Sequence, residues 1–148
     1  MNKSWHIKQF NELSTRELYQ ILQLRNDVFV VEQNCVYQDA DGKDYDAYHL
    51  FLEKGNQIIS YARLFKSGDY FDNASIGRVV VHPKFRKQNL GNILMQKAID
   101  FVTVTLQEKN IEISAQTYLL KFYNDLGFVT IGDEYFEDGL PHIQMIYG

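Results

Sequence analysis

The sequence is poor in cysteine and in long apolar runs, and each shortage excludes a class of protein. Of 148 residues, only Cys35 is a cysteine. A single cysteine excludes an internal disulfide framework and a cysteine-rich zinc site, and it is typical of a reducing compartment. No apolar run approaches the roughly 18–20 residues of a membrane span, and the first residues lack the apolar stretch of a signal peptide. We therefore expect a cytoplasmic protein with no membrane partner and no metal.

Basic residues are also in short supply. Lys and Arg number 15 against 19 Asp and Glu, which gives a formal net charge of −4. Nucleic-acid binders usually carry a basic excess, so we expect no nucleic-acid partner. The length corresponds to one domain at about 150 residues per domain, and a hydrophobic content of 45% is enough for a core. Residues 1–148 are therefore expected to form a single domain.

The acidic residues concentrate in residues 38–46. An EF-hand calcium loop needs glycine at its sixth position and glutamate at its twelfth, whereas counting from Asp39 places Gly42 fourth and Leu50 twelfth. We interpret the run as a solvated loop. The alternative is an acidic rim that attracts a cationic substrate. Arg25, Arg63 and Arg78 lie on elements expected to be buried, where they would need Glu32, aspartates or a substrate carboxylate as partners.

Hydrophobic periodicity predicts the element order β-α-β-β-β-α-β-α-β-β. The first helix follows a capping box of Ser14 and Glu17, and the third ends at Gly127. An acidic connection at 133–139 would join the last two strands. This order indicates a mixed α/β (α+β) sheet of about 6–7 strands flanked by about 3–4 helices. The expected strands are 5–10, 49–53, 58–65, 75–82, 111–115, 128–131 and 142–147, and the helices are 18–29, 90–106 and 119–126.

The stretch from Val79 to Asn92 carries the most chemical information. An apolar strand stops at Pro83, basic residues follow, and a helix starts near Leu90. Free backbone N–H groups and the dipole at a helix N-terminus suit a pyrophosphate, although an ordinary strand–loop–helix connection would have the same pattern. Asn89 tolerates a left-handed conformation better than most residues. The signatures of dinucleotide dehydrogenases, P-loop ATPases, serine hydrolases and zinc proteases are all missing.

Two segments resemble motifs of the GNAT N-acetyltransferases. Residues 86–91, RKQNLG, resemble the acetyl-CoA signature [RQ]-x-x-G-x-[GA], with Asn89 in place of the first glycine. Residues 122–128, FYNDLGF, resemble the family's F-Y-x-x-L-G-F segment, and the element order is the GNAT order along the whole chain. Residues 25–33, 77–79 and 137–142 are similar to the ElaA-type subgroup.

The resemblance implies a single-domain GNAT fold with a splayed strand pair that binds acetyl-CoA. The strand through Val79 and Val81 would separate from residues 113–115 and pair with the pantetheine amides, and backbone N–H groups of residues 86–92 would hold the pyrophosphate. The implied function is acetyl transfer to a primary amine by direct attack. The cofactor-binding residues so implied are Val79, Val80, Val81, Arg86, Lys87, Gln88, Asn89, Leu90, Gly91, Asn92 and Tyr123.

The same resemblance makes Tyr123 the general acid that protonates the leaving thiolate, although its helical position also suits a core residue. The candidate bases are Glu32, His49 and His142, each with a structural alternative, and a water chain is also possible in their place. Cys35 as a ping-pong nucleophile is a weaker hypothesis.

Two other functions stay open. One is a catalytically silent CoA-binding sensor or interaction module. The other is a distant relative of acyl-homoserine-lactone synthases, for which the chain is short. GNAT domains often pair through sheet edges, so a homodimer is a possible assembly.

Overall fold

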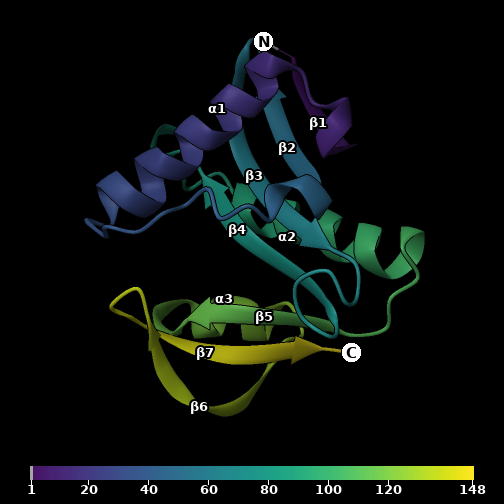
Figure 1. The fold of residues 1–148 in the computed structure, drawn as a ribbon, viewed down its shortest axis with the longest axis vertical. Coiled ribbons are helices and arrows are strands. Elements are labelled where there is room, and N and C mark those ends of the chain that lie inside the picture. The colour runs from purple at the N-terminus through teal and green to yellow at the C-terminus, as the bar shows by residue number, and fades with distance from the viewer. Residues whose placement is uncertain (1) are drawn as a thin grey trace.

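The computed structural model describes residues 2–148 (Figure 1). Its elements follow the predicted order. None of the helices in this range is long and apolar enough to span a membrane. The elements are β1 (Lys3–Gln9), α1 (Thr15–Arg25), β2 (Tyr48–Lys54), β3 (Gln57–Phe65), β4 (Ala74–Val81), α2 (Leu90–Asp100), β5 (Ile111–Gln116), α3 (Leu120–Asp125), β6 (Val129–Glu137) and β7 (Leu140–Tyr147).

The seven strands form one mixed sheet in the order β1-β2-β3-β4-β5-β7-β6. All neighbours are antiparallel except β4 and β5, which are parallel. These two strands pair only at Ala74–Ile111 and Ser75–Glu112 and then diverge, as the gap between them in Figure 1 shows. The splayed pair expected from the family resemblance is therefore present.

A β-bulge interrupts β4 at the start of the divergence. Tyr61 of β3 pairs with Val80 and Arg63 pairs with Gly77, so one residue of β3 faces two of β4. Arg78 occupies the bulge with a φ of 50°. A bulge bends its strand and redirects the side chains that follow. The rest of β4 therefore borders the gap.

Helices cover both faces of the sheet. Leu94, Met95 and Ala98 of α2 pack in the larger core with Ile76 of β4 and Ile113 of β5. On the opposite face, α1 packs through Ile21, Leu24 and Val28 against Phe51, Tyr61 and Val80. The helix α1 continues into a π-helical segment, Asn26–Glu32, that carries the chain to the gap.

Local signals define the ends of two helices. The Ser14 Oγ accepts a hydrogen bond from the Glu17 N–H at 3.0 Å, and the Glu17 Oε1 accepts one from the Ser14 N–H at 2.8 Å, which confirms the capping box at α1. Gly127 follows α3 with a φ of 105°. That conformation favours glycine and ends the helix as predicted.

The predicted connection at 133–139 is wrong. The strand β6 continues to Glu137, and only Asp138 and Gly139 form the turn, with φ of 51° and 77°. Two positive φ values are typical of a tight β-hairpin with an Asp-Gly turn. Because β6 is an edge strand whose side chains are mostly exposed, it lacks the apolar alternation that predicts a strand.

Candidate functional site

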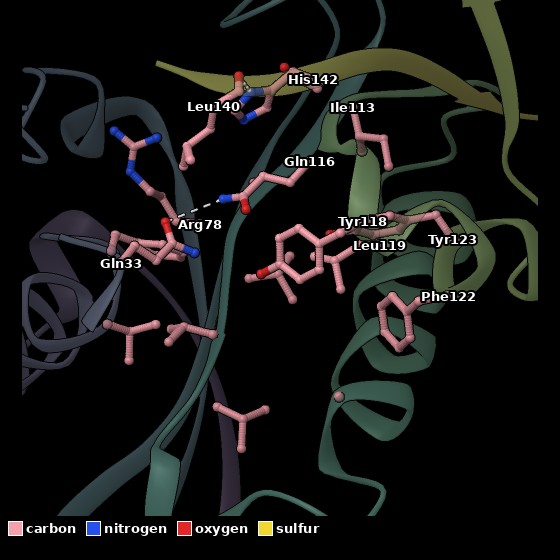
Figure 2. Close-up of a pocket in the computed structure, with 18 of the residues that line it drawn as sticks. Gln33, Arg78, Ile113, Gln116, Tyr118, Leu119, Phe122, Tyr123, Leu140 and His142 are labelled. Atoms are coloured by element: carbon pink, nitrogen blue, oxygen red, sulfur yellow. Dashed lines mark hydrogen bonds between the residues drawn. The ribbon is translucent and has the colours of Figure 1, made fainter. Parts of the chain in front are cut away.

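A cavity of about 660 Å³ lies where β4 and β5 diverge. The π-helical segment after α1, the bulge of β4, the loop before α2, β5, α3 and the β6–β7 hairpin all contribute to its wall. Figure 2 shows side chains from this wall, including Gln33, which follows the π-helical segment, and Gln116 of β5, which face each other at 3.4 Å. Segments far apart in the sequence therefore meet around one space.

Most of the residues implied as cofactor ligands line this cavity. All of them lie within the described chain, and among them only Gln88 does not line the cavity. Those that line the cavity are Val79, Val80, Val81, Arg86, Lys87, Asn89, Leu90, Gly91, Asn92 and Tyr123.

The start of α2 fits an anion. Asn89 is the residue before the helix and has a left-handed φ of 62°. Its Oδ1 accepts a hydrogen bond from the side chain of Asn92 at 2.7 Å, and the Asn89 side chain makes no capping hydrogen bond to the first helical turn. Since the first N–H groups of a helix have no partner within it, they can bind a phosphate.

Glu32 and Arg86 face each other at this cavity. Both guanidinium Nη atoms of Arg86 donate to the Glu32 carboxylate at 2.7 Å, and Arg86 Nε donates to the Val81 carbonyl at 3.1 Å. Glu32 was one of the partners expected for the buried arginines, and the structure pairs it with Arg86 instead. The hydrogen bonds from Arg86 lower the pKa of Glu32. A carboxylate held in this way is a weak proton acceptor, which disfavours Glu32 as the base.

His49 does not line the cavity. It is fully buried, with Nδ1 2.6 Å from the Tyr61 hydroxyl and Nε2 2.9 Å from the Asp44 carbonyl. Burial lowers the pKa of its imidazole. Both ring nitrogens are engaged inside the core, so the structure gives no support to His49 as the base.

His142 does line the cavity and is 7% exposed. Its Nδ1 lies 2.8 Å from the Leu140 carbonyl. A carbonyl can only accept, so the proton of the neutral ring is on Nδ1 and Nε2 keeps a lone pair. This Nε2 lies 3.7 Å from Oε2 of Glu137. Of the three candidate bases, His142 is the one with a free nitrogen at the cavity.

Tyr123 enters the cavity from α3 and is 7% exposed. Its ring packs edge-on against Phe122 and Phe128, with centroids 5.1 and 5.9 Å away. Burial raises the pKa of its hydroxyl, which keeps the phenol protonated at neutral pH. The residue thus belongs to the core and also presents a proton donor to the cavity.

Two aspartates of the acidic loop are buried, and none of residues 38–46, all within the described chain, lines the cavity. Asp39 is buried and accepts hydrogen bonds from Arg25 Nε at 2.7 Å and Arg78 Nε at 2.8 Å. Asp44 is also buried and binds Nη1 of Arg25 at 2.8 Å and of Arg63 at 2.9 Å. Buried arginines need counterions, and this need places the aspartates inside. The expected pairing of the three arginines with aspartates is confirmed.

Sequence reasoning missed Ser114, Tyr135 and Glu137. Ser114 and Glu137 line the cavity, and the Tyr135 ring stacks on His142 at 6.1 Å. The Asp138-Gly139 pair is a hairpin signal that would have placed Glu137 opposite Leu140 and close to His142. Cys35 also lines the cavity, and its Sγ lies 3.1 Å from the Asp138 carbonyl.

Comparisons with known proteins agree with this geometry. A family model described as an acetyltransferase (GNAT) domain matches residues 15–147. Protein ElaA of Escherichia coli strain K12 is 42% identical over 143 residues, which cover 95% of this chain and 94% of ElaA. The crystal structure of Escherichia coli ElaA has a TM-score of 0.92 at 40% identity, covering 99% of this chain and 100% of that one.

A second solved structure is equally similar. The crystal structure of an acyl-CoA N-acyltransferase from Pseudomonas aeruginosa has a TM-score of 0.92 at 37% identity and covers 98% of this chain and 99% of its own. The matched family model covers both the splayed strands and the loop before α2. The chain therefore belongs to the GNAT acetyltransferase family and is similar to ElaA over almost its whole length.

Proposed function

We propose that this protein transfers an acetyl group from acetyl-CoA to a primary amine. One observation carries the proposal: a single cavity connects the anion-binding start of α2 with the hydroxyl of Tyr123 and the free imidazole nitrogen of His142. Acetyl-CoA supplies an acetyl group activated as a thioester. Backbone groups of Val79 and Val81 would hold its pantetheine, and the N–H groups around Asn89 and Gly91 would hold its pyrophosphate.

His142 is the proposed base. An alkylammonium has a pKa of about 10.4, so the amine must lose a proton before its nitrogen can attack a carbonyl carbon. The Nε2 lone pair of His142 can accept this proton, while the hydrogen bond from Nδ1 to the Leu140 carbonyl holds the ring in place.

Tyr123 is the proposed acid. Its raised pKa keeps a proton on the hydroxyl, and that proton can pass to the thiolate that leaves as the new amide forms. The burial of Tyr123 among aromatic rings holds the hydroxyl in one place. Base and acid thus line one cavity. The base acts on the attacking amine, and the acid acts on the leaving thiolate.

The variant Tyr123→Phe tests this function, because it removes the hydroxyl and keeps the ring in the core. We expect kcat for acetyl transfer to fall about 100-fold or more, with the Kd of acetyl-CoA changed less than about twofold. Thiol release with a panel of amines gives kcat, and calorimetry gives Kd. Tyr118→Phe is the matched control, because Tyr118 lines the same cavity but is 73% exposed.

The outcomes separate three cases. Turnover that falls only in Tyr123→Phe supports the proposed acid. Acetyl-CoA binding without turnover of any amine would identify a silent CoA-binding module instead. No binding of acetyl-CoA would overturn the proposal as a whole.

A further inference from the structure

Polar side chains of β5, β6 and β7 surround His142 and have no role in the reaction as described so far. Ser114 and Glu137 line the cavity together with His142, and Tyr135 lies behind them. The hydrogen bonds among these groups can be followed from a fixed end, because Glu112 at the other end of the chain of contacts can only accept. This makes it possible to assign the protons one by one.

Glu112 fixes the proton positions at one end of these contacts. Its carboxylate accepts hydrogen bonds from Gln144 Nε2 at 2.7 Å and from Asn73 Nδ2 at 3.2 Å. The Gln144 amide nitrogen must therefore face Glu112, and the amide oxygen faces the other way. This Oε1 lies 2.7 Å from the Tyr135 hydroxyl. Because an amide oxygen has no proton to give, Tyr135 donates there.

The next contact leaves the cluster one proton short. The Ser114 hydroxyl contacts both the Tyr135 hydroxyl and, at 3.3 Å, the Glu137 Oε1. Tyr135 donates to Gln144 and Ser114 donates to the Glu137 Oε1, so the contact between the two hydroxyls has no proton of its own. Three contacts thus share two protons.

His142 adds a second contact without a proton. Its Nδ1 proton is used by the Leu140 carbonyl, so its Nε2 lone pair faces the Glu137 Oε2 at 3.7 Å. Within residues 2–148, no hydrogen-bond donor lies within bonding distance of this nitrogen, which faces the cavity. The Glu137 carboxylate thus accepts a hydrogen bond from Ser114 Oγ at Oε1, while its Oε2 faces the lone pair of His142 Nε2 with no proton between them. A donor that enters from the cavity can therefore bind to the acceptor atoms that face it.

We propose that Ser114 Oγ, the Glu137 carboxylate and His142 Nε2 form the subsite that binds the ammonium group of the acceptor. A primary ammonium brings up to three N–H donors and one positive charge to a site with three acceptor groups and one negative charge. This inference rests on the proposed function and adds the residues that select its substrate. Bound there, the ammonium has an N–H directed at His142 Nε2, the nitrogen that is to take its proton.

The subsite implies a ranking of ligands. A tertiary ammonium has the same charge but a single N–H, so it can satisfy only one of the three acceptors. An alcohol has one donor and no charge. We therefore expect primary amines to bind more tightly than their N,N-dimethyl counterparts, and alcohols to bind weakest.

Binding of n-butylamine at neutral pH tests the subsite without acetyl-CoA. The readout is the ring nitrogen resonances of His142 in ¹⁵N-histidine-labelled protein. We expect a saturable shift of Nε2 with n-butylamine and a Kd at least tenfold weaker for N,N-dimethylbutylamine. In Glu137→Gln and Ser114→Ala the Kd of n-butylamine should also rise about tenfold or more, because each loses an acceptor to a charged group.

Glu134→Gln is the matched control, since Glu134 is an exposed carboxylate on the same strand and its loss changes the net charge equally. This variant should bind n-butylamine as the wild type does. An equal effect of Glu134→Gln and Glu137→Gln would overturn the subsite, because charge alone would explain it. A wild-type protein whose Nε2 is already protonated at pH 7 would also overturn it, since His142 would then supply the missing proton.

Acetyl-CoA binding, measured separately by calorimetry, distinguishes this inference from the proposed function. Acetyl-CoA that binds while n-butylamine does not would remove the subsite and leave the cofactor half standing. n-Butylamine that binds while acetyl-CoA does not would remove the proposed function and leave an amine-binding site.

Discussion

Glu32 and Arg86 form a two-point ion pair that joins the π-helical segment after α1 to the loop before α2. Both bonds measure 2.7 Å, and the two side chains are 41% and 40% exposed. They belong to segments 54 residues apart in the sequence and both line the cavity. The pair therefore connects the segment that follows α1 to the segment that fits a pyrophosphate.

Glu32→Gln should tighten acetyl-CoA binding a few-fold. The exposed pair contributes no more than about 1 kcal/mol to stability, so the fold should survive its loss. Without the carboxylate, the full charge of Arg86 can act on the cofactor phosphates. Calorimetry at low and high salt measures the effect, which should shrink as salt rises. Weaker binding in Glu32→Gln would contradict this and would show that Glu32 holds the guanidinium in position.

Asp39→Asn should strongly destabilise the protein. Asp39 neutralises Arg25 and Arg78 from a buried position, and removal of one partner of a buried pair costs about 3–5 kcal/mol. Denaturant unfolding measures the loss. Asp46→Asn is the control, because Asp46 lies in the same loop but is exposed, and it should change stability by less than about 0.5 kcal/mol. Similar losses in both variants would contradict the buried network.

Stability should fall as the pH drops below about 6.5, in part because of His49. Burial lowers the pKa of its imidazole, so in this range the unfolded chain binds the proton more readily than the folded one. A group whose pKa is lower in the folded than in the unfolded protein stabilises the fold at any pH above its pKa in the unfolded chain. This contribution is lost as the pH falls from that value towards the pKa of the group in the folded protein. The structural cause is that the lone pair of Nδ1 accepts the hydrogen bond from the Tyr61 hydroxyl. Protonation of Nδ1 would break this hydrogen bond inside the core.

Thermal unfolding between pH 7.5 and pH 5 checks this expectation in the wild type and in His49→Gln. The variant should have a lower Tm at pH 7.5, because the hydrogen bonds of the imidazole are lost, and a shallower decrease of Tm towards pH 5. An equally steep decrease in both proteins would show that His49 does not contribute.

Several features follow from short segments and could be predicted without the tertiary structure. The capping box of Ser14 and Glu17 spans four residues and needs no distant partner. The left-handed turn at Asn89 and the helix end at Gly127 depend on the same kind of local preference. The Asp138-Gly139 pair also predicts a hairpin turn from adjacent residues alone. The turn was not predicted, because the strand before it is exposed and lacks apolar alternation.

The acidic loop shows where sequence reasoning fails. Nothing local distinguishes Asp39 and Asp44, which are buried, from Asp46, which is exposed. The difference comes from Arg25 and Arg63, which reach them from α1 and β3. Charge patterns along the chain describe solvation only where no distant partner of opposite charge is present.

The sequence could not decide among the candidate bases either. Glu32, His49 and His142 are indistinguishable as isolated side chains that can accept a proton. The fold pairs Glu32 with Arg86, encloses His49 in the core, and leaves Nε2 of His142 at the cavity. Only contacts between segments distant in sequence separate them.

The sequence by itself determined the order of the elements, the start of α1, the end of α3 and the family, because these depend on periodicity, on local backbone preferences and on motifs of adjacent residues. The tertiary structure alone decided which charges are buried, which imidazole is free and where Glu137 meets Ser114. Those outcomes depend on desolvation and on hydrogen-bond partners that come from other strands and helices, and no short segment of the chain contains both members of such a pair.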